Sequence, residues 1–267
     1  MATTTSPWPA LSYETWSATC DTLHTHTQVL GKLAVELAPP EPQLQHAALR
    51  LTARGWETAP LPAPDGSGAI AAALDLRTHE AVVEHNDGRA VRVPLTPHRP
   101  VAEVTREVLD AVGRLAGPVD INPAPQEVPW AAPLDQDTEH ATYETDQVAT
   151  YFAAATQAAL VLAEFRAPYR GRSTPVNAWW GTFDLAVSFF SGKPAPPPSD
   201  DFIMRNSGNA EQIAVGWCVR LGSGAGRERE GQPAAGQLTP AKICRHGGFF
   251  TWAGRLTSWG RVSLYLP

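Results

Sequence analysis

Several motifs that mark common protein classes are absent from this sequence of 267 residues. It contains no Walker phosphate loop, no GxSxG nucleophile motif and no HExxH metal motif, which removes the enzyme classes those motifs mark. No hydrophobic run approaches the roughly 20 residues that span a bilayer, and the N-terminus lacks the basic-then-hydrophobic order of a secretory signal. We therefore expect a cytoplasmic protein that does not bind membranes.

Cysteine is scarce, with only Cys20, Cys218 and Cys244. The three are scattered and form no CxxC pair, which argues against a structural zinc site of the finger type. An odd number of scattered cysteines fits reduced thiols better than a disulfide framework.

A surplus of positive charge is also missing, since the net charge is −6. Nucleic acid is therefore not the expected partner, because phosphate binding needs an excess of Lys and Arg. Residues 218–267 differ from the rest, with seven basic and two acidic side chains. With 43% hydrophobic and 18% charged residues overall, we expect a single packed domain over residues 1–217 and an atypical, basic, glycine-rich tail over residues 218–267.

Hydrophobic periodicity predicts the first elements of the chain. Residues 12–30 repeat hydrophobic positions at helical spacing, and Gly31 is expected to end this helix. Alternating patterns then predict a strand over residues 32–37 and a half-polar strand over residues 45–54.

The middle of the chain reads as a β-meander followed by a helix. The last two strands of the meander are joined by Asn86-Asp87-Gly88, residue types that tolerate the positive φ of a tight hairpin. The predicted strands cover residues 69–76, 81–85 and 89–95, and the helix covers residues 100–116, beginning at a proline and ending before Gly117.

The last third predicts a connector, a long helix and a long strand. A proline-rich acidic connector spans residues 118–144, a helix begins at Thr145 and ends before Pro168, and a strand spans residues 176–191. Together these elements favour an α+β fold, a mostly antiparallel sheet with a few helices packed on it. A weak similarity between residues 12–116 and 145–217 leaves open whether the domain consists of two similar halves.

Several short motifs together resemble one uncharacterised bacterial family, the domain of unknown function numbered five-nine-nine-six. The resemblance covers about residues 8–217 and implies a shared architecture, but no reaction. The tail departs from the family pattern, and many relatives have His where this chain has Asn177. The motifs on which the resemblance rests are Trp8-Pro9-Ala10-Leu11 with Trp16, Thr22-Leu23-His24, Thr52-Ala53-Arg54-Gly55, Asp137-Thr138-Glu139-His140 and Trp180-Gly181-Thr182-Phe183-Asp184-Leu185-Ala186.

The first predicted helix contains two histidines, His24 and His26, which are candidate metal ligands. At 100° per residue, His24 and His26 lie about 160° apart around the helix, so they do not share one ion. His24 lies at the edge of the hydrophobic stripe, from where its imidazole can reach a pocket.

The predicted strand over residues 45–54 places His46, Arg50, Thr52 and Arg54 on one face. An Arg pair on a strand can bind a carboxylate or phosphate, with a histidine as acid or base beside it. The alternative interpretation is a solvated outer face of the sheet.

Asp184 is the most informative single residue. It lies on the more polar face of the predicted strand over residues 176–191, with Trp180 on the same face. A carboxylate in such an aromatic setting is costly to bury unless it is paired, and we expect Arg54 to be its partner. A structural ion pair and a catalytic carboxylate are both compatible with this pattern.

These residues define the leading hypothesis, an α+β protein that binds a small molecule. His24, His46 and Asp184 would carry acid/base catalysis if the protein is an enzyme. A second version makes these three residues the ligands of a divalent metal. The alternative is a non-catalytic interaction or structural module, and a homo-oligomer is compatible with either. The remaining residues expected to bind the substrate are Arg50, Arg54, Trp179 and Trp180.

Overall fold

The computed structural model describes residues 9, 11, 13–218 and 248–253. The glycine-rich part of the predicted tail lies outside the described residues. In the described part, four α-helices and one 3-10 helix accompany two antiparallel sheets, which confirms the predicted α+β class. The helices are α1 (Tyr13–Leu37), η1 (Pro42–Ala47), α2 (Val101–Ala116), α3 (Thr145–Arg166) and α4 (Phe202–Ser207).

The two sheets come from different parts of the chain. The larger has the order β1-β2-β4-β5-β6, with β3 paired to β4, and the smaller has the order β10-β9-β8-β7. The strands of the larger sheet are β1 (Arg50–Leu51), β2 (Gly55–Glu57), β3 (Leu61–Pro62), β4 (Ala69–Asp75), β5 (Glu80–His85) and β6 (Ala90–Pro94). Those of the smaller sheet are β7 (Asn177–Trp179), β8 (Asp184–Pro194), β9 (Ala210–Cys218) and β10 (Gly248–Ala253).

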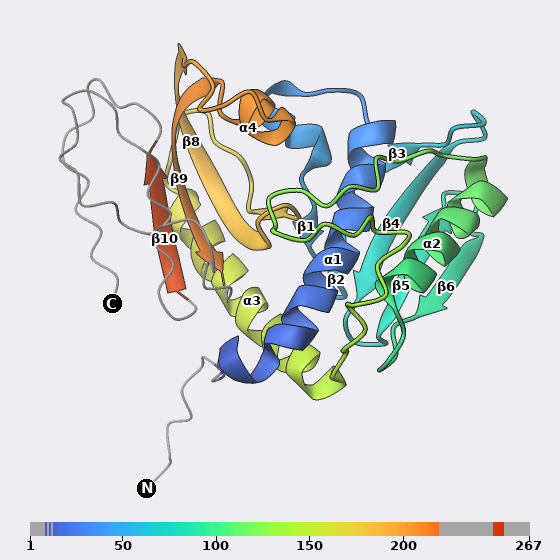
Figure 1. Cartoon of the computed structure of the whole chain (residues 1–267). Helices are drawn as coiled ribbons and strands as arrows, with labels where there is room; N and C mark the ends of the chain where they lie inside the picture. Colours follow the sequence, from blue (N-terminus) through green and yellow to red (C-terminus); the bar gives the residue numbers. More distant parts are fainter. Residues whose placement is uncertain (1–8, 10, 12, 219–247, 254–267) are drawn as a thin grey trace, which may run out of the picture.

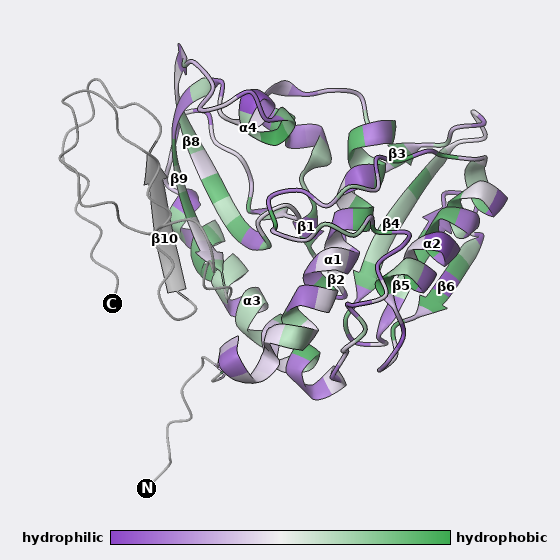
Figure 2. Cartoon of the chain, in the orientation of Figure 1, coloured by the Kyte–Doolittle hydropathy of each residue, from purple (hydrophilic) through white to green (hydrophobic). Residues whose placement is uncertain are grey.

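Helix α1 runs between the two sheets (Figure 1). Helix α2 packs on β4, β5 and β6, while α3 packs on β8 and β9. A bridge between Leu49 and Ala178 joins the sheets through two backbone hydrogen bonds of 3.0 and 2.9 Å. Hydrophobic residues fill the strands that face the helices, as the green of β4 and β8 shows in Figure 2. One continuous hydrophobic core therefore includes residues of both sheets.

Helix α1 is longer than the sequence predicted, and the strand expected over residues 32–37 is wrong. The helix continues through Gly31 because this glycine serves close packing rather than helix termination. A Cβ atom at Gly31 would overlap the indole ring of Trp180, so only glycine fits under the ring.

The half-polar strand expected over residues 45–54 is also wrong. Its first part belongs to η1, in which Gln43 and Leu44 have left-handed φ angles of 55° and 54°. Only Arg50 and Leu51 form a strand, β1, so the polar residues of this stretch do not share one strand face.

The meander and helix α2 are confirmed. Strands β4, β5 and β6 pair in sequence order, and Gly88 has a φ of 96° in the last hairpin. Helix α2 begins after Pro100 and ends before Gly117, whose φ is 90°. The local turn chemistry was therefore sufficient to locate these elements.

The long strand expected over residues 176–191 is two strands. A turn formed by residues 180–183 separates β7 from β8, and the two strands then pair with each other. The hairpin brings Trp179 directly opposite Asp184.

Helix α3 is long and hydrophobic enough to cross a membrane by length and composition alone, contrary to our expectation that no segment approaches this length. It is the one such helix in the described part of the chain, and core helices of soluble proteins pass the same test. One face of α3 contributes Val148, Tyr151 and Leu162 to the core.

The cysteines do not share one state. Cys20 is a free, buried thiol in α1, as expected. Cys218, at the end of β9, is disulfide-bonded, so the expectation of reduced thiols is wrong for this residue.

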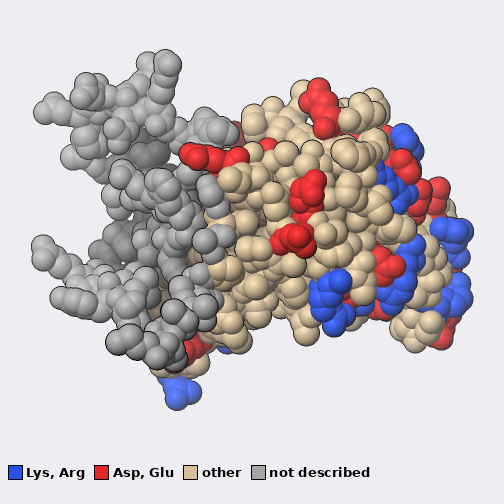
Figure 3. All heavy atoms as spheres, turned by 90° about the horizontal axis from the view of Figure 1, so that it is seen from below, with Lys and Arg blue, Asp and Glu red and all other residues tan. Residues whose placement is uncertain are grey.

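Charged side chains of both signs crowd the end of the molecule that carries β4–β6 and α2 (Figure 3). Several of these charges form ion pairs, among them Arg92 with Glu80 and Arg99 with Glu103. On the face seen in Figure 3, cations and carboxylates alternate at this end, unlike the uniform basic surface that nucleic acid favours.

Candidate functional site

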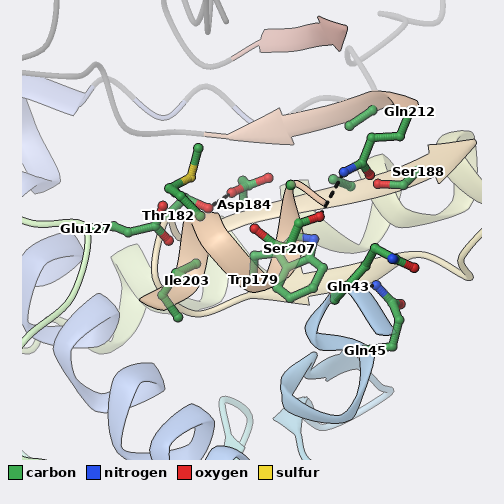
Figure 4. A pocket seen from close by; sticks show the side chains of 14 residues that line it. Gln43, Gln45, Glu127, Trp179, Thr182, Asp184, Ser188, Ile203, Ser207 and Gln212 are labelled. Atoms are coloured by element: carbon green, nitrogen blue, oxygen red, sulfur yellow. Dashed lines mark hydrogen bonds between the residues drawn. The ribbon is translucent and has the colours of Figure 1, made fainter. Parts of the chain in front are cut away.

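A cavity of about 270 Å³ lies on the face of strands β7–β9, where η1 and α4 approach the sheet. In Figure 4, Glu127, Thr182 and Asp184 gather toward one end, while Gln43 and Gln45 lie toward the other. The cavity therefore has an acidic end and an amide end. Its lining residues are Gln43, Gln45, Glu127, Trp179, Thr182, Asp184, Ala186, Ser188, Ile203, Met204, Ser207, Gly208, Gln212 and Ala214.

The alternation of strand β8 creates the floor of the cavity. Asp184, Ala186 and Ser188 are two residues apart, so their side chains point to the same side of the sheet. Strand β9 extends this floor, because Ala214 lies directly opposite Ser188. The other face of β8 contributes Leu185 and Val187 to the core.

The turn that precedes β8 is anchored from α1 and η1. The Nε2 atom of His24 lies 2.9 Å from the carbonyl oxygen of Trp180 and 3.1 Å from that of Gly181. Because a carbonyl oxygen only accepts, Nε2 carries the proton and donates to these oxygens. The indole of Trp180 donates to the carbonyl oxygen of Ala47 at 3.0 Å. Three buried hydrogen bonds thus fix one turn.

Phe183 holds the same turn from the other side. Its φ of 54° is left-handed, a costly conformation for an aromatic residue. Its ring stacks on those of His24, Trp56 and Tyr151, with centroid distances of 5.0, 5.1 and 5.1 Å. Stacking in the core stabilises this strained conformation and sets the direction in which the chain enters β8.

Asp184 is the first residue of β8 and is buried, with 3% of its surface exposed. Its carboxylate accepts a hydrogen bond from the hydroxyl of Thr182. Trp179 lies directly across from it on β7, and both line the cavity. The hairpin therefore places a carboxylate and an indole side by side at the acidic end.

Glu127 brings a second carboxylate from the connector between α2 and α3. Its backbone has a left-handed φ of 58°. A Cβ atom at Gly181 would overlap the Oε2 atom of Glu127, so the missing side chain of Gly181 provides the space for this carboxylate. The glycine of the turn and the acid of the connector thus fit each other.

The opposite end of the cavity is a network of amides. The guanidinium of Arg172 donates to Oε1 of Gln43, whose Nε2 donates to Oδ1 of Asn209 at 2.9 Å. Asn177 donates to Oε1 of Gln45 at 2.9 Å, and Gln45 in turn donates to the backbone oxygen of Gln43 at 3.1 Å. These bonds orient both glutamines and hold the left-handed segment of η1 in place.

Backbone strain gathers around this cavity. The described part of the chain has six non-glycine residues with positive φ. Gln43 and Glu127 line the cavity, and Leu44 and Phe183 adjoin lining residues. Such strain persists where surrounding structure enforces it, and it clusters at functional sites. The clustering of these strained residues around the cavity therefore supports a functional role for it.

Only some of the site residues proposed from the sequence line the cavity. Asp184 and Trp179 line the cavity, whereas His24 and Trp180 lie behind it and hold the turn. His46 accepts a hydrogen bond from the backbone N–H of Glu41 at 2.9 Å. Burial lowers the pKa of His46, and the charge of the Glu41 carboxylate opposes this shift.

Neither arginine of the proposed anion clamp lines the cavity. Arg50 donates to Oδ1 of Asn177, and burial lowers the pKa of its guanidinium. Arg54 binds Glu57 at 2.6 Å and Glu84 at 2.9 Å, both in the larger sheet. The expected ion pair between Arg54 and Asp184 is therefore wrong, because two nearer carboxylates already bind Arg54.

The three-ligand metal site is not assembled either. Among residues 9–218, as far as the structure describes them, no group of three His, Cys, Asp or Glu side chains is placed to hold a metal ion. His24, His46 and Asp184 have the separate environments described above.

Several lining residues were not among the site residues predicted from the sequence. Thr182 and Ser188 lie on the same face of the predicted strand as Asp184, so the alternating pattern could have identified them. Gln43, Gln45 and Glu127 lie in irregular segments without periodicity, where no local pattern marks a site.

Comparison with known proteins adds a family but no activity. A family model described as a family of unknown function, DUF5996, matches residues 8–227, which is most of the chain. The comparison with curated proteins gave no match, and neither did the comparison with solved structures. The turn anchored by His24 and the cavity beside it thus belong to a chain that is a member of the family of unknown function DUF5996.

Proposed function

We propose that this protein binds a small polar molecule in the cavity on β7–β9. The observation that carries this proposal is the burial of polar side chains around a hollow rather than in a filled core. Asp184, Gln43, Gln212 and Ser188 are at most 8% exposed and all line the cavity. The protein's own hydrogen bonds orient several of these groups beside an open space, and a few oriented polar groups around a hollow are typical of small-molecule sites.

The size and charge of the cavity limit its ligand. About 270 Å³ lies at the lower end of the range for small-molecule pockets, so the ligand is small. The described lining contains two carboxylates and no Lys, Arg or His. A phosphorylated or carboxylated ligand would meet repulsion there. An uncharged or cationic molecule is favoured over the anion that the sequence interpretation considered.

Catalysis in this cavity would use Asp184 and Glu127. They are the carboxylates among the described lining residues, and carboxyl groups serve as general acids and bases. His24 would then be a positioning residue, because its Nε2 proton is engaged with the carbonyl oxygens of Trp180 and Gly181.

The burial of the aromatic strand disfavours the alternative of an interaction module. Such a module would present the aromatic residues of 179–190 to a partner. Trp180, Phe183 and Phe190 are instead at most 5% exposed, and Trp179 and Phe189 are half-buried. A cytoplasmic location remains a prediction from the sequence.

A cavity-filling variant tests the proposal. Ala214→Phe places a bulky ring in the cavity without removing a polar group, and Ala90→Phe adds the same ring on the exposed edge of β6. Thermal unfolding is measured for each protein against a set of small neutral, cationic and anionic metabolites. We expect some compounds to raise the Tm of the wild type and of Ala90→Phe, but not that of Ala214→Phe. The proposal fails if no compound distinguishes Ala214→Phe from the other two proteins.

A further inference from the structure

We propose that the molecule bound in this cavity is a small organic cation, an amine whose ammonium group lies between the indole of Trp179 and the carboxylates of Asp184 and Glu127. This inference rests on the proposed function and specifies its ligand class.

Trp179 and Asp184 form a directly opposed pair on strands β7 and β8. Directly opposed residues of an antiparallel pair have Cβ atoms about 5 Å apart, so one small group can contact both side chains. An ammonium gains from the face of an indole and from a carboxylate at the same time. Neither contact favours an anion.

The polar side chains of the wall direct donors into the protein. Gln43, Gln45 and Gln212 each donate one of their two amide N–H groups to another protein group, at 2.9, 3.1 and 2.9 Å. Thr182 donates its hydroxyl proton to Asp184. The wall therefore engages part of its donors internally, and the two carboxylates add acceptor oxygens to the lining, which suits a ligand that is itself rich in donors.

Glu127 and Gly181 fit each other at the rim of the cavity. The turn has no side chain where Oε2 of Glu127 lies, and Glu127, although exposed, has a strained φ of 58°. These two features fix the position of its carboxylate. Together they place a second negative charge at the end of the cavity that holds Asp184 (Figure 4).

The neighbouring guanidinium groups lie away from the acidic end of the cavity. Arg172 and Arg50 lie behind the opposite end, where they donate to the side chains of Gln43 and Asn177. The cavity therefore has an acidic end and a neutral amide end, and the described lining contributes no cation.

The experiment compares matched probes by isothermal titration calorimetry. The cation is 1,4-diaminobutane, its uncharged isostere is 1,4-butanediol, and glucose represents neutral polyols. We expect the diamine to bind at least about tenfold more tightly than the diol or glucose, since a charge-assisted hydrogen bond contributes roughly 1.5 kcal/mol or more. Its affinity should fall as ionic strength rises, because its contacts are charged.

Three substitutions locate the bound cation. Asp184→Asn keeps the shape of the side chain and should weaken diamine binding at least about tenfold. Gly181→Ala should displace the flexible carboxylate of Glu127 and weaken binding by a smaller factor, with the fold intact. Asp120→Asn, on an exposed part of the connector, removes the same charge outside the cavity and should leave binding unchanged.

Two outcomes overturn the inference. If the diol or glucose binds as tightly as the diamine, the ligand is a neutral polyol, and the proposed small-molecule function stands. If none of the three probes binds, or if Asp184→Asn binds the diamine like Asp120→Asn, the cation site is refuted. The comparison of Ala214→Phe with Ala90→Phe then decides separately whether the cavity binds any small molecule.

Discussion

The imidazole of His24, in the first helix, donates a hydrogen bond of 2.9 Å to the backbone oxygen of Trp180, 156 residues further along the chain. This bond joins the helix between the two sheets to the turn that presents Thr182 and Asp184 to the cavity. The histidine is 1% exposed, so it acts on the site through the backbone and not by contact with a ligand.

Replacing His24 should damage both the fold and the site. His24→Ala leaves two buried carbonyl oxygens without their donor and removes the ring that stacks on Phe183, so we expect a loss of about 3 kcal/mol in the free energy of unfolding. Urea denaturation measures this loss. The control His46→Ala, half-buried at η1, should cost less than about 1 kcal/mol. Equal effects of the two substitutions would contradict a specific role for His24.

Two helical glycines should respond in opposite ways to the same substitution. Gly31→Ala forces a methyl group into the ring of Trp180 and should destabilise the protein by about 1–3 kcal/mol. Gly113→Ala, on the exposed side of α2 with nothing within 4 Å of the added atom, should stabilise it by about 0.5–1 kcal/mol. Chemical denaturation of both variants checks the signs. A stabilising Gly31→Ala would show that the helix does not pack on Trp180.

The left-handed conformation of Glu127 should be visible as a difference between two truncations. Glu127→Gly and Glu127→Ala both remove the carboxylate, but only glycine adopts a φ of 58° without strain. We expect the glycine variant to be more stable by about 1 kcal/mol, measured by urea denaturation. Both should lose affinity for 1,4-diaminobutane. An alanine variant as stable as the glycine variant would argue against the strained backbone.

Buried His26 should make stability depend on pH. Burial lowers its pKa from 6.5 to about 4, with Asp137 opposing this shift and Arg99 adding to it. The unfolded chain therefore binds a proton at higher pH than the folded protein does. Stability should be complete above pH 6.5 and fall by up to about 3 kcal/mol as the pH drops to 4.

The control for this prediction is His26→Gln, which does not titrate. Denaturation curves between pH 4 and 7 should show a shallower slope for the variant than for the wild type, whatever its absolute stability. Nδ1 of His26 has no hydrogen-bond partner in the part of the chain that the structure describes, so the imidazole has little to offset its burial. Identical slopes would mean that His26 does not contribute.

Local signals in the sequence were sufficient for much of the fold. The meander and α2 were predicted correctly because their turn and end signals are local. Asn86-Asp87-Gly88 forms the hairpin turn, and Pro100 and Gly117 flank the helix. The same reasoning wrongly predicted a helix end at Gly31. This glycine is required by its contact with the ring of Trp180 and does not terminate the helix. Contacts between distant residues leave no trace in a local pattern.

The candidate site was predictable in part, for the same reason. Asp184 was identified because its strand alternates and carries aromatic residues. The same alternation puts Trp179 on the other face of one continuous strand, and only the turn at residues 180–183 brings it opposite Asp184. Arg54 was assigned to Asp184 on charge alone, yet Glu57 and Glu84 lie closer to it in the folded chain. Glu127 could not be found, because its position depends on a space at Gly181 that only the folded chain creates.

A crystal structure of the protein grown with 1,4-diaminobutane would show the cation site itself. We expect electron density for the diamine in the cavity, with one nitrogen within hydrogen-bond distance of the carboxylate of Asp184 and next to the ring of Trp179. A cavity filled by the protein's own side chains, or a diamine bound only elsewhere on the surface, would refute the site.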